Sequence, residues 1–135
     1  MADKSLSEQI SKLISPDAGS PQPLTDDDKK FAAEYSKSVA GLSPDAQALA
    51  FKNVIRIEGR CGFANGGWYH YLINTDGGNR YRVTVRTYWR QGIDSGQYDL
   101  TYVSEAGGRQ DLGCSESGSI PVAYYTRQVV GEVRI

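Results

Sequence analysis

The chain has 135 residues, a formal net charge of −1 at pH 7 and a pI near 5.8. This length fits one domain, and the near-neutral charge disfavours a nucleic acid or an anionic lipid surface as the partner. No apolar stretch approaches the ~20 residues that cross a bilayer, so we predict a soluble protein without a membrane span. The single histidine, His70, excludes a metal site built from several histidines. No phosphate-binding loop or dinucleotide fingerprint occurs, and we expect neither a metal nor a cofactor.

The composition changes abruptly near Lys52 and Asn53. All six lysines lie at or before this point, whereas all nine arginines, both tryptophans and eight of the nine tyrosines follow it. The two parts must therefore obey different structural rules. We divide the chain into a short helix with a proline-rich linker over residues 1–24, a helical segment over 25–52 and a β domain over 53–135.

Helix signals dominate the first part of the chain. Residues 5–14 carry apolar side chains at helical spacing, and prolines with a glycine then predict an extended linker over 15–24. Thr25 is a predicted N-cap, followed by three aspartates that suit the positive end of the helix dipole, and Gly41 is a natural stop. Pro44 fits the first position of one more helix. Two or three short helices are therefore expected before the β domain.

Beyond residue 53 the apolar period changes to two. The clearest strand covers residues 80–90, where Val83 and Val85 share one face while Arg82 and Arg86 share the other. The expected strands are 54–58, 68–74, 80–90, 97–104, 110–114, 120–126 and 129–135, with a loop over 91–96 and a bulge near 127–128 that joins the last two strands. The pattern predicts a mainly β fold. We expect an antiparallel β-sandwich of six to seven strands, immunoglobulin-like in architecture or barrel-like.

Cys61 and Cys114 are the only cysteines, and each lies beside a glycine near the end of a predicted strand. A disulfide between them would close a loop of about 54 residues and contribute roughly 4 kcal/mol in the chain-entropy model. The alternative is a pair of buried thiols in a cytosolic protein. We favour the disulfide, and with it an exported protein, periplasmic or secreted, over a cytoplasmic one. Trp68 follows Cys61 too closely to match the cysteine and tryptophan spacing of immunoglobulin domains.

Arginine side chains gather on the polar face of the strand over residues 80–90. Arg82, Arg86 and Arg90 share this face with Tyr88 and could bind anionic groups. The alternative is an ordinary solvated face whose arginines pair with acids on neighbouring strands. The near-neutral net charge weighs toward that alternative.

The β domain is also rich in aromatic residues, and strand alternation cannot bury them all. Tyr69 and Tyr71 lie on one strand and Tyr88 on another, and we include all three among the candidate binding residues. Exposed aromatic rings suit a protein interface or a flat sugar platform. The alternative is that the rings pack in the core with their hydroxyl groups at its edge.

No catalytic spacing stands out in this sequence. A serine triad would need His70 as its base, and no Gly-x-Ser-x-Gly motif occurs. We therefore predict a non-catalytic binding or adaptor module that presents aromatic and arginine side chains to a protein partner, with carbohydrate as the second ligand class. The rival hypothesis is a carbohydrate-active or hydrolytic β protein that uses loop carboxylates such as Asp94 and Asp99.

Overall fold

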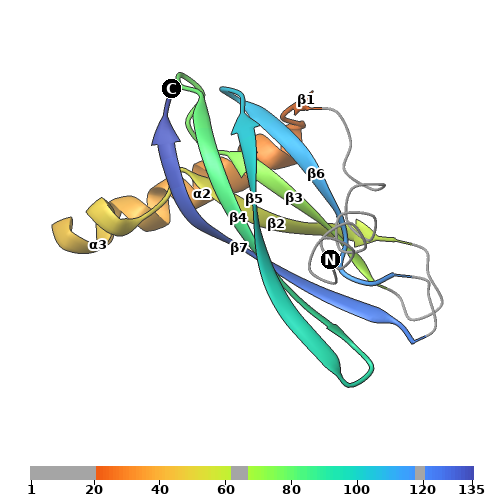
Figure 1. Cartoon of the computed structure of the whole chain (residues 1–135). Helices are drawn as coiled ribbons and strands as arrows, with labels where there is room; N and C mark the ends of the chain where they lie inside the picture. Colours follow the sequence, from red (N-terminus) through yellow and green to blue (C-terminus); the bar gives the residue numbers. More distant parts are fainter. Residues whose placement is uncertain (1–20, 62–66, 118–120) are drawn as a thin grey trace.

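The computed structural model describes residues 21–61, 67–117 and 121–135, and it shows a mainly β molecule with two helices before the main strands (Figure 1). The helix expected over residues 5–14 lies outside the described ranges. None of the described helices is long and apolar enough to cross a membrane. The elements in chain order are β1 (Gln22–Pro23), α2 (Asp26–Ala40), α3 (Pro44–Leu49), β2 (Asn53–Arg60), β3 (Trp68–Asn74), β4 (Tyr81–Gln91), β5 (Asp94–Ser104), β6 (Gly108–Cys114) and β7 (Ala123–Arg134).

The strands form two antiparallel sheets that pack as a sandwich. One sheet has the order β1-β6-β3-β2 and is called sheet A; the other has the order β5-β4-β7 and is called sheet B. Both sheets contain only antiparallel pairs. The predicted β-sandwich is thus confirmed.

The core lies between the two sheets and follows the alternation of the sequence. Val83 and Val85 of β4 are 0% and 1% exposed, whereas Arg82 on the same strand is exposed. The largest buried cluster takes residues from both sheets: Leu72, Tyr81, Val83, Val85, Leu112 and Val129. Because such side chains are worth roughly 1.5–3 kcal/mol each on burial, this cluster is a major source of the stability of the sandwich.

The connection between β4 and β5 is tighter than the sequence suggested. The predicted loop over residues 91–96 is wrong, because Gln91 pairs with Asp94 and only Gly92 and Ile93 form the turn. Gly92 has a φ of +61°, a conformation that glycine adopts without steric cost at the first central position of a two-residue hairpin. As a result β5 begins at Asp94, three residues earlier than expected.

The long final strand is confirmed in part. Residues 123–134 form one strand, β7, as the alternation indicated. The irregularity lies later than the predicted position at 127–128: Thr84 pairs with Gly131 and Val85 with Val129, so Val130 is the extra residue. Residues on either side of a bulge face differently from strict alternation. Glu132 therefore shares the register of the buried Val83.

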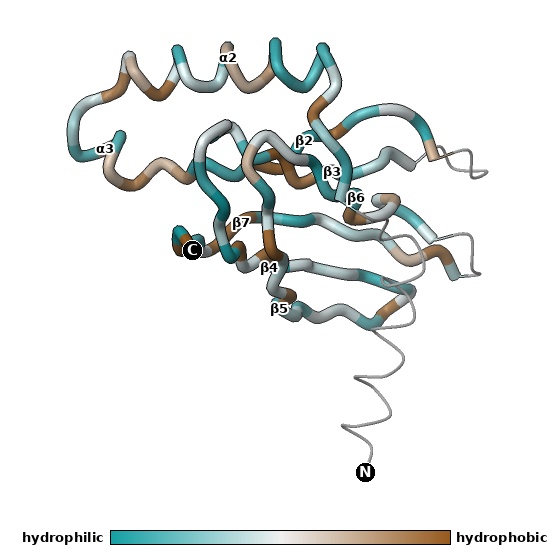
Figure 2. The backbone as a smooth tube through the Cα atoms, turned by 90° about the horizontal axis from the view of Figure 1, so that it is seen from above, coloured by the Kyte–Doolittle hydropathy of each residue, from teal (hydrophilic) through white to brown (hydrophobic). Residues whose placement is uncertain are grey.

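Helix α2 begins as predicted and covers the outer face of sheet A. Thr25 is its N-cap, and a capping box joins the Thr25 hydroxyl and backbone to Asp28. Figure 2 shows α2 on the side of β2, β3 and β6, with β4, β5 and β7 on the opposite side. Ile73 of β3 is paired with Arg109 and therefore lies on the outer face of sheet A. It is nevertheless fully buried, because α2 contacts β3 on this face. The outer face of sheet B has no such cover among the described residues.

The disulfide predicted between Cys61 and Cys114 is present. It joins the end of β6 to the residue that follows β2. Cys114 is buried, and Cys61 is half-buried.

Candidate binding surface

The outer face of β4 forms the candidate surface. We call the group Arg82, Arg86, Tyr88, Arg90 and the neighbouring Tyr124 the arginine face. These side chains lie opposite the buried stripe of the same strand, and Arg90 is paired in register with Tyr124 of β7. Tyr88 and Tyr124 are 38% and 41% exposed, so both rings are accessible to a partner. The structure thus brings four of the six predicted binding residues onto one uncovered sheet face.

Arg86 is the one arginine of this face whose guanidinium is held by a carboxylate among the described residues. Its Nε and Nη2 atoms donate to the two carboxylate oxygens of Asp99 on β5, at 2.9 and 3.2 Å. The hydrogen bond from Arg86 lowers the pKa of Asp99, and the same bond raises the pKa of Arg86. A two-point pair of this kind holds a guanidinium in one orientation, although an exposed pair adds little stability. This contact agrees with the alternative weighed for Arg86.

Arg82 and Arg90 differ from Arg86. None of the ion pairs found among the described residues involves either of them. The guanidinium of Arg90 lies 5.5 Å from the ring centroid of Tyr124, a cation–π distance. With Asp99 as the acid paired to β4, the three arginines leave an excess of two positive charges on this face. That excess is local, since the whole chain carries a net charge of −1.

Tyr69 and Tyr71 do not belong to this surface. Both lie on β3 in sheet A, and the two sheets of the sandwich separate them from Arg82, Arg86 and Arg90. Their ring centroids are 6.2 Å apart. The guanidinium of Arg109 lies 3.9 Å from the centroid of the Tyr71 ring, and burial raises the pKa of the Tyr71 hydroxyl. The six predicted binding residues therefore do not form one site.

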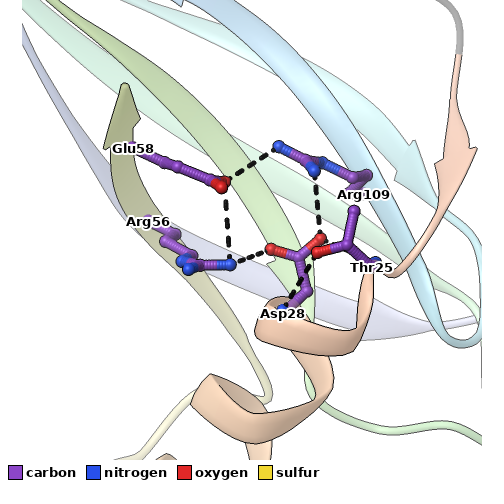
Figure 3. Close-up of polar contacts among 5 residues, drawn as sticks. All are labelled: Thr25, Asp28, Arg56, Glu58 and Arg109. Atoms are coloured by element: carbon purple, nitrogen blue, oxygen red, sulfur yellow. Dashed lines mark hydrogen bonds and ion pairs between the residues drawn. The ribbon is translucent and has the colours of Figure 1, made fainter. Parts of the chain in front are cut away.

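A buried ion-pair network joins α2 to the outer face of sheet A (Figure 3). Asp28 is fully buried and accepts from Arg56 of β2, and its other carboxylate oxygen lies 3.2 Å from Arg109 Nη1 of β6. Glu58 completes the ring, 3.6 Å from Arg56 and 3.2 Å from Arg109. Burial alone would raise the pKa of Asp28, but its hydrogen bonds with Thr25 and Arg56 and the charge of Arg109 outweigh that effect and lower it. No local sequence pattern predicts this network; the capping box with Thr25 is the one local signal that singles out Asp28.

A second buried polar group lies between the sheets. Arg127 of β7 is 7% exposed, and its Nη1 lies 3.0 Å from His70 Nδ1 and 3.1 Å from the carbonyl oxygen of Cys114. Since a guanidinium can only donate, Nδ1 accepts and the neutral His70 carries its proton on Nε2. Burial, with the charge of Arg127, lowers the pKa of His70 to about 4. His70 thus has a structural environment, and its position gives no support for a role as a catalytic base.

The carboxylates of the rival hypothesis are not brought together. Asp94 and Asp99 lie five positions apart on β5, and strand alternation directs them to opposite faces of sheet B. Asp99 is committed to Arg86. Within the described ranges, no group of three or more histidine, cysteine, aspartate or glutamate residues could hold a metal ion.

Comparisons of the chain with protein-family models, with curated proteins and with solved structures give no match.

Proposed function

We propose that this chain is a non-catalytic binding module and that the arginine face is its contact surface for an acidic patch on a partner protein. The observation that supports it is the contrast between the two outer faces of the sandwich. Helix α2 and the network around Asp28 cover part of the outer face of sheet A, whereas no described element covers the arginine face, and Arg82 and Arg90 have no carboxylate partner among the described residues.

The chemistry of this face suits a protein surface better than a flat sugar. Arginine binds carboxylates through two parallel hydrogen bonds, and tyrosine offers a large ring at low entropic cost. The Arg90 guanidinium already lies over Tyr124, which leaves less of that ring for a sugar to stack on. We place the module in an oxidising compartment, because disulfides persist there and are rare in the cytosol.

The hydrolytic alternative receives no support from the geometry. Hydrolysis of a glycosidic bond uses two carboxyl groups that flank one bond. Asp94 and Asp99 are directed to opposite faces of β5, so they cannot act on a single substrate. Carbohydrate is therefore only a second ligand class, which the binding experiment includes.

A paired array experiment tests the proposal. The labelled chain is applied to an array of acidic peptides and to a glycan array, as wild type and as the Arg82→Ala/Arg90→Ala double variant. The matched control is Lys29→Ala/Lys30→Ala, which removes the same charge from exposed positions of α2. We expect acidic peptides to bind wild type and the control, and to lose most of their signal with the arginine variant or at raised salt.

Two results would contradict the proposal. One is binding to acidic peptides that the arginine variant and the lysine variant weaken equally, which would indicate a general charge effect. The other is binding restricted to neutral glycans and insensitive to salt, which would favour carbohydrate recognition. Thermal melting of each variant confirms that a change in binding does not arise from unfolding.

A further inference from the structure

The two sheets leave a slot open between β2 and β7, on a different side of the sandwich from the arginine face. These strands are edge strands of sheets A and B, they contact each other, and they share no strand pairing among the described residues. A cavity of about 260 Å³ lies between them. Its lining, which we call the edge slot, consists of Tyr35, Phe51, Asn53, Val54, Ile55, Arg127, Gln128 and Val129.

The chain itself closes both ends of the free edge of β7. At one end the Glu132 carboxylate accepts the backbone N–H groups of Lys52 and Asn53, each at 3.0 Å. At the other end the Tyr125 N–H donates to the carbonyl oxygen of Ser115 at 2.8 Å. Between these contacts no described strand pairs with the free edge of β7 over residues 126–131, which is the length of a short strand.

The backbone direction along this edge follows from those two contacts. Successive residues of a strand direct their N–H and C=O groups to alternate sides. Tyr125 directs its N–H away from β4, so Arg127 and Val129, at alternate positions before the bulge at Val130, also direct their N–H groups away from β4. Asn53 directs its N–H toward Glu132, so Ile55 and Ile57 of β2 present their backbone groups on the same side. The edge slot therefore offers peptide donors and acceptors from both walls.

One inward-facing side chain shows that the sandwich is incomplete here. Ile57 pairs in register with His70, whose side chain is 5% exposed between the sheets. Cross-strand partners share a face, so Ile57 belongs to the inner face of sheet A. Yet Ile57 is 61% exposed, whereas its partner His70 on the same face is buried. Ile55 on the same face is only half-buried. Ile55 lines the edge slot, and Ile57 extends the same apolar face of β2 by one further inward position, so we call these two residues the apolar floor.

We propose that the edge slot accepts an extended segment of a partner protein as an added strand on β7, about five residues long, with apolar side chains at alternate positions. An added strand would pair with the N–H and C=O groups of Arg127 and Val129, which meet no other strand in the described part of the chain, and would cover Ile55 and Ile57. A helix or a small apolar ligand would leave those backbone groups buried without partners. The described N-terminal stretch is not placed to fill the slot, since β1 pairs with β6 at the opposite edge of sheet A.

The experiment is amide hydrogen exchange read by NMR on the full chain, with a synthetic peptide as the probe. The peptide has seven residues, with valine alternating with threonine between two terminal lysines. A second peptide has the same sequence with alternate backbone nitrogens methylated, which removes the groups that a strand partner must supply. We expect the first peptide to slow exchange of the Arg127 and Val129 amides by on the order of tenfold, and the methylated peptide to leave them unchanged.

Two variants distinguish the edge slot from other surfaces. Ile57→Lys places a charge on the apolar floor at a position that is already mostly exposed, so the fold should tolerate it. Ile93→Lys is the matched control, since Ile93 is fully exposed in the turn between β4 and β5. Ile57→Lys should abolish the protection of Arg127 and Val129, and Ile93→Lys should preserve it.

The outcomes are decisive in either direction. Protection of β5 amides alone, equal effects of both peptides, or no protection at millimolar peptide would overturn the proposal. Slow exchange of Arg127 and Val129 in the free, dilute chain would also overturn it, since the protein would then fill its own slot. None of these results depends on the arginine face, which lies on the outer surface of sheet B.

Discussion

The stability of the protein should fall between pH 7.5 and pH 5 because of one residue, His70. Its side chain is 5% exposed, and its Nδ1 accepts from Arg127. Burial and the Arg127 charge lower its pKa from 6.5 to about 4. In this pH window the unfolded chain binds a proton at His70 and the folded chain does not. Acid therefore favours the unfolded state, and stability declines as the pH falls through 6.5 toward 4.

The size of the effect follows from the two pKa values. A shift from 6.5 to 4 gives a loss of about 2 kcal/mol in the free energy of unfolding between pH 7.5 and 5, and about 3 kcal/mol in full. Asp28, Asp76 and Asp99 have pKa values below the ordinary range, so their stabilisation is lost at lower pH. The interval from pH 7.5 to 5 therefore reports mainly on His70.

Urea unfolding at pH 7.5 and pH 5, with the disulfide intact, measures the loss. The variant His70→Gln keeps a hydrogen-bond acceptor for Arg127 but does not titrate, so its two unfolding free energies should agree within ~0.5 kcal/mol. The control Asp76→Asn removes a carboxylate whose pKa is about 2, and the difference between its two values should match that of wild type. A wild type without the drop, or a His70→Gln variant that retains it, would refute the assignment.

Three further outcomes are expected from the fold. Val83→Ala should cost on the order of 1–3 kcal/mol in urea unfolding and Arg82→Ala well under ~1 kcal/mol, because one side chain is buried and the other exposed; the reverse order would mean that β4 faces the other way. Without reductant, the intact mass should be two hydrogens below the mass calculated for the chain with both cysteines reduced. Reduction of Cys61 and Cys114 should lower the free energy of unfolding by about 4 kcal/mol, and quantitative thiol labelling of the native protein would contradict this. Asp28→Asn should cost roughly 3–5 kcal/mol, since it leaves two buried guanidinium groups with Glu58 alone; a thermal melt unchanged from wild type would show that the network adds nothing.

Local rules explain what the sequence could predict. The alternation in β4 correctly separates Val83 from Arg82, because a residue's face depends only on its neighbours along the strand. The bounds of β3 agree with the prediction over residues 68–74, and Thr25 is the N-cap of α2 as expected. The disulfide could also be anticipated, since Cys61 and Cys114 lay near the predicted ends of two strands.

Long-range relations explain what the sequence could not predict. Asp28 meets Arg56 and Arg109 only because α2 crosses sheet A, and no local pattern records that crossing. Tyr69 resembled the residues of the arginine face in type, yet the topology places it in the other sheet. The position of the bulge at Val130 depends on the pairing of β7 with β4, so periodicity located it only approximately.

The fold also decides which arginines are available for recognition. Arg56 and Arg109 are held by the buried Asp28, and Arg127 donates to His70 and to a carbonyl in the core. Each of these guanidinium groups is mostly buried, and moving one toward a ligand would break buried contacts at a cost of several kcal/mol. Arg82 and Arg90 carry no such cost, because both are exposed on the uncovered sheet. Of these five arginines, only Arg82 and Arg90 can contact a ligand without breaking buried contacts. Loss of binding on Arg56→Ala should therefore accompany a loss of stability, whereas Arg82→Ala should weaken binding with little loss of stability.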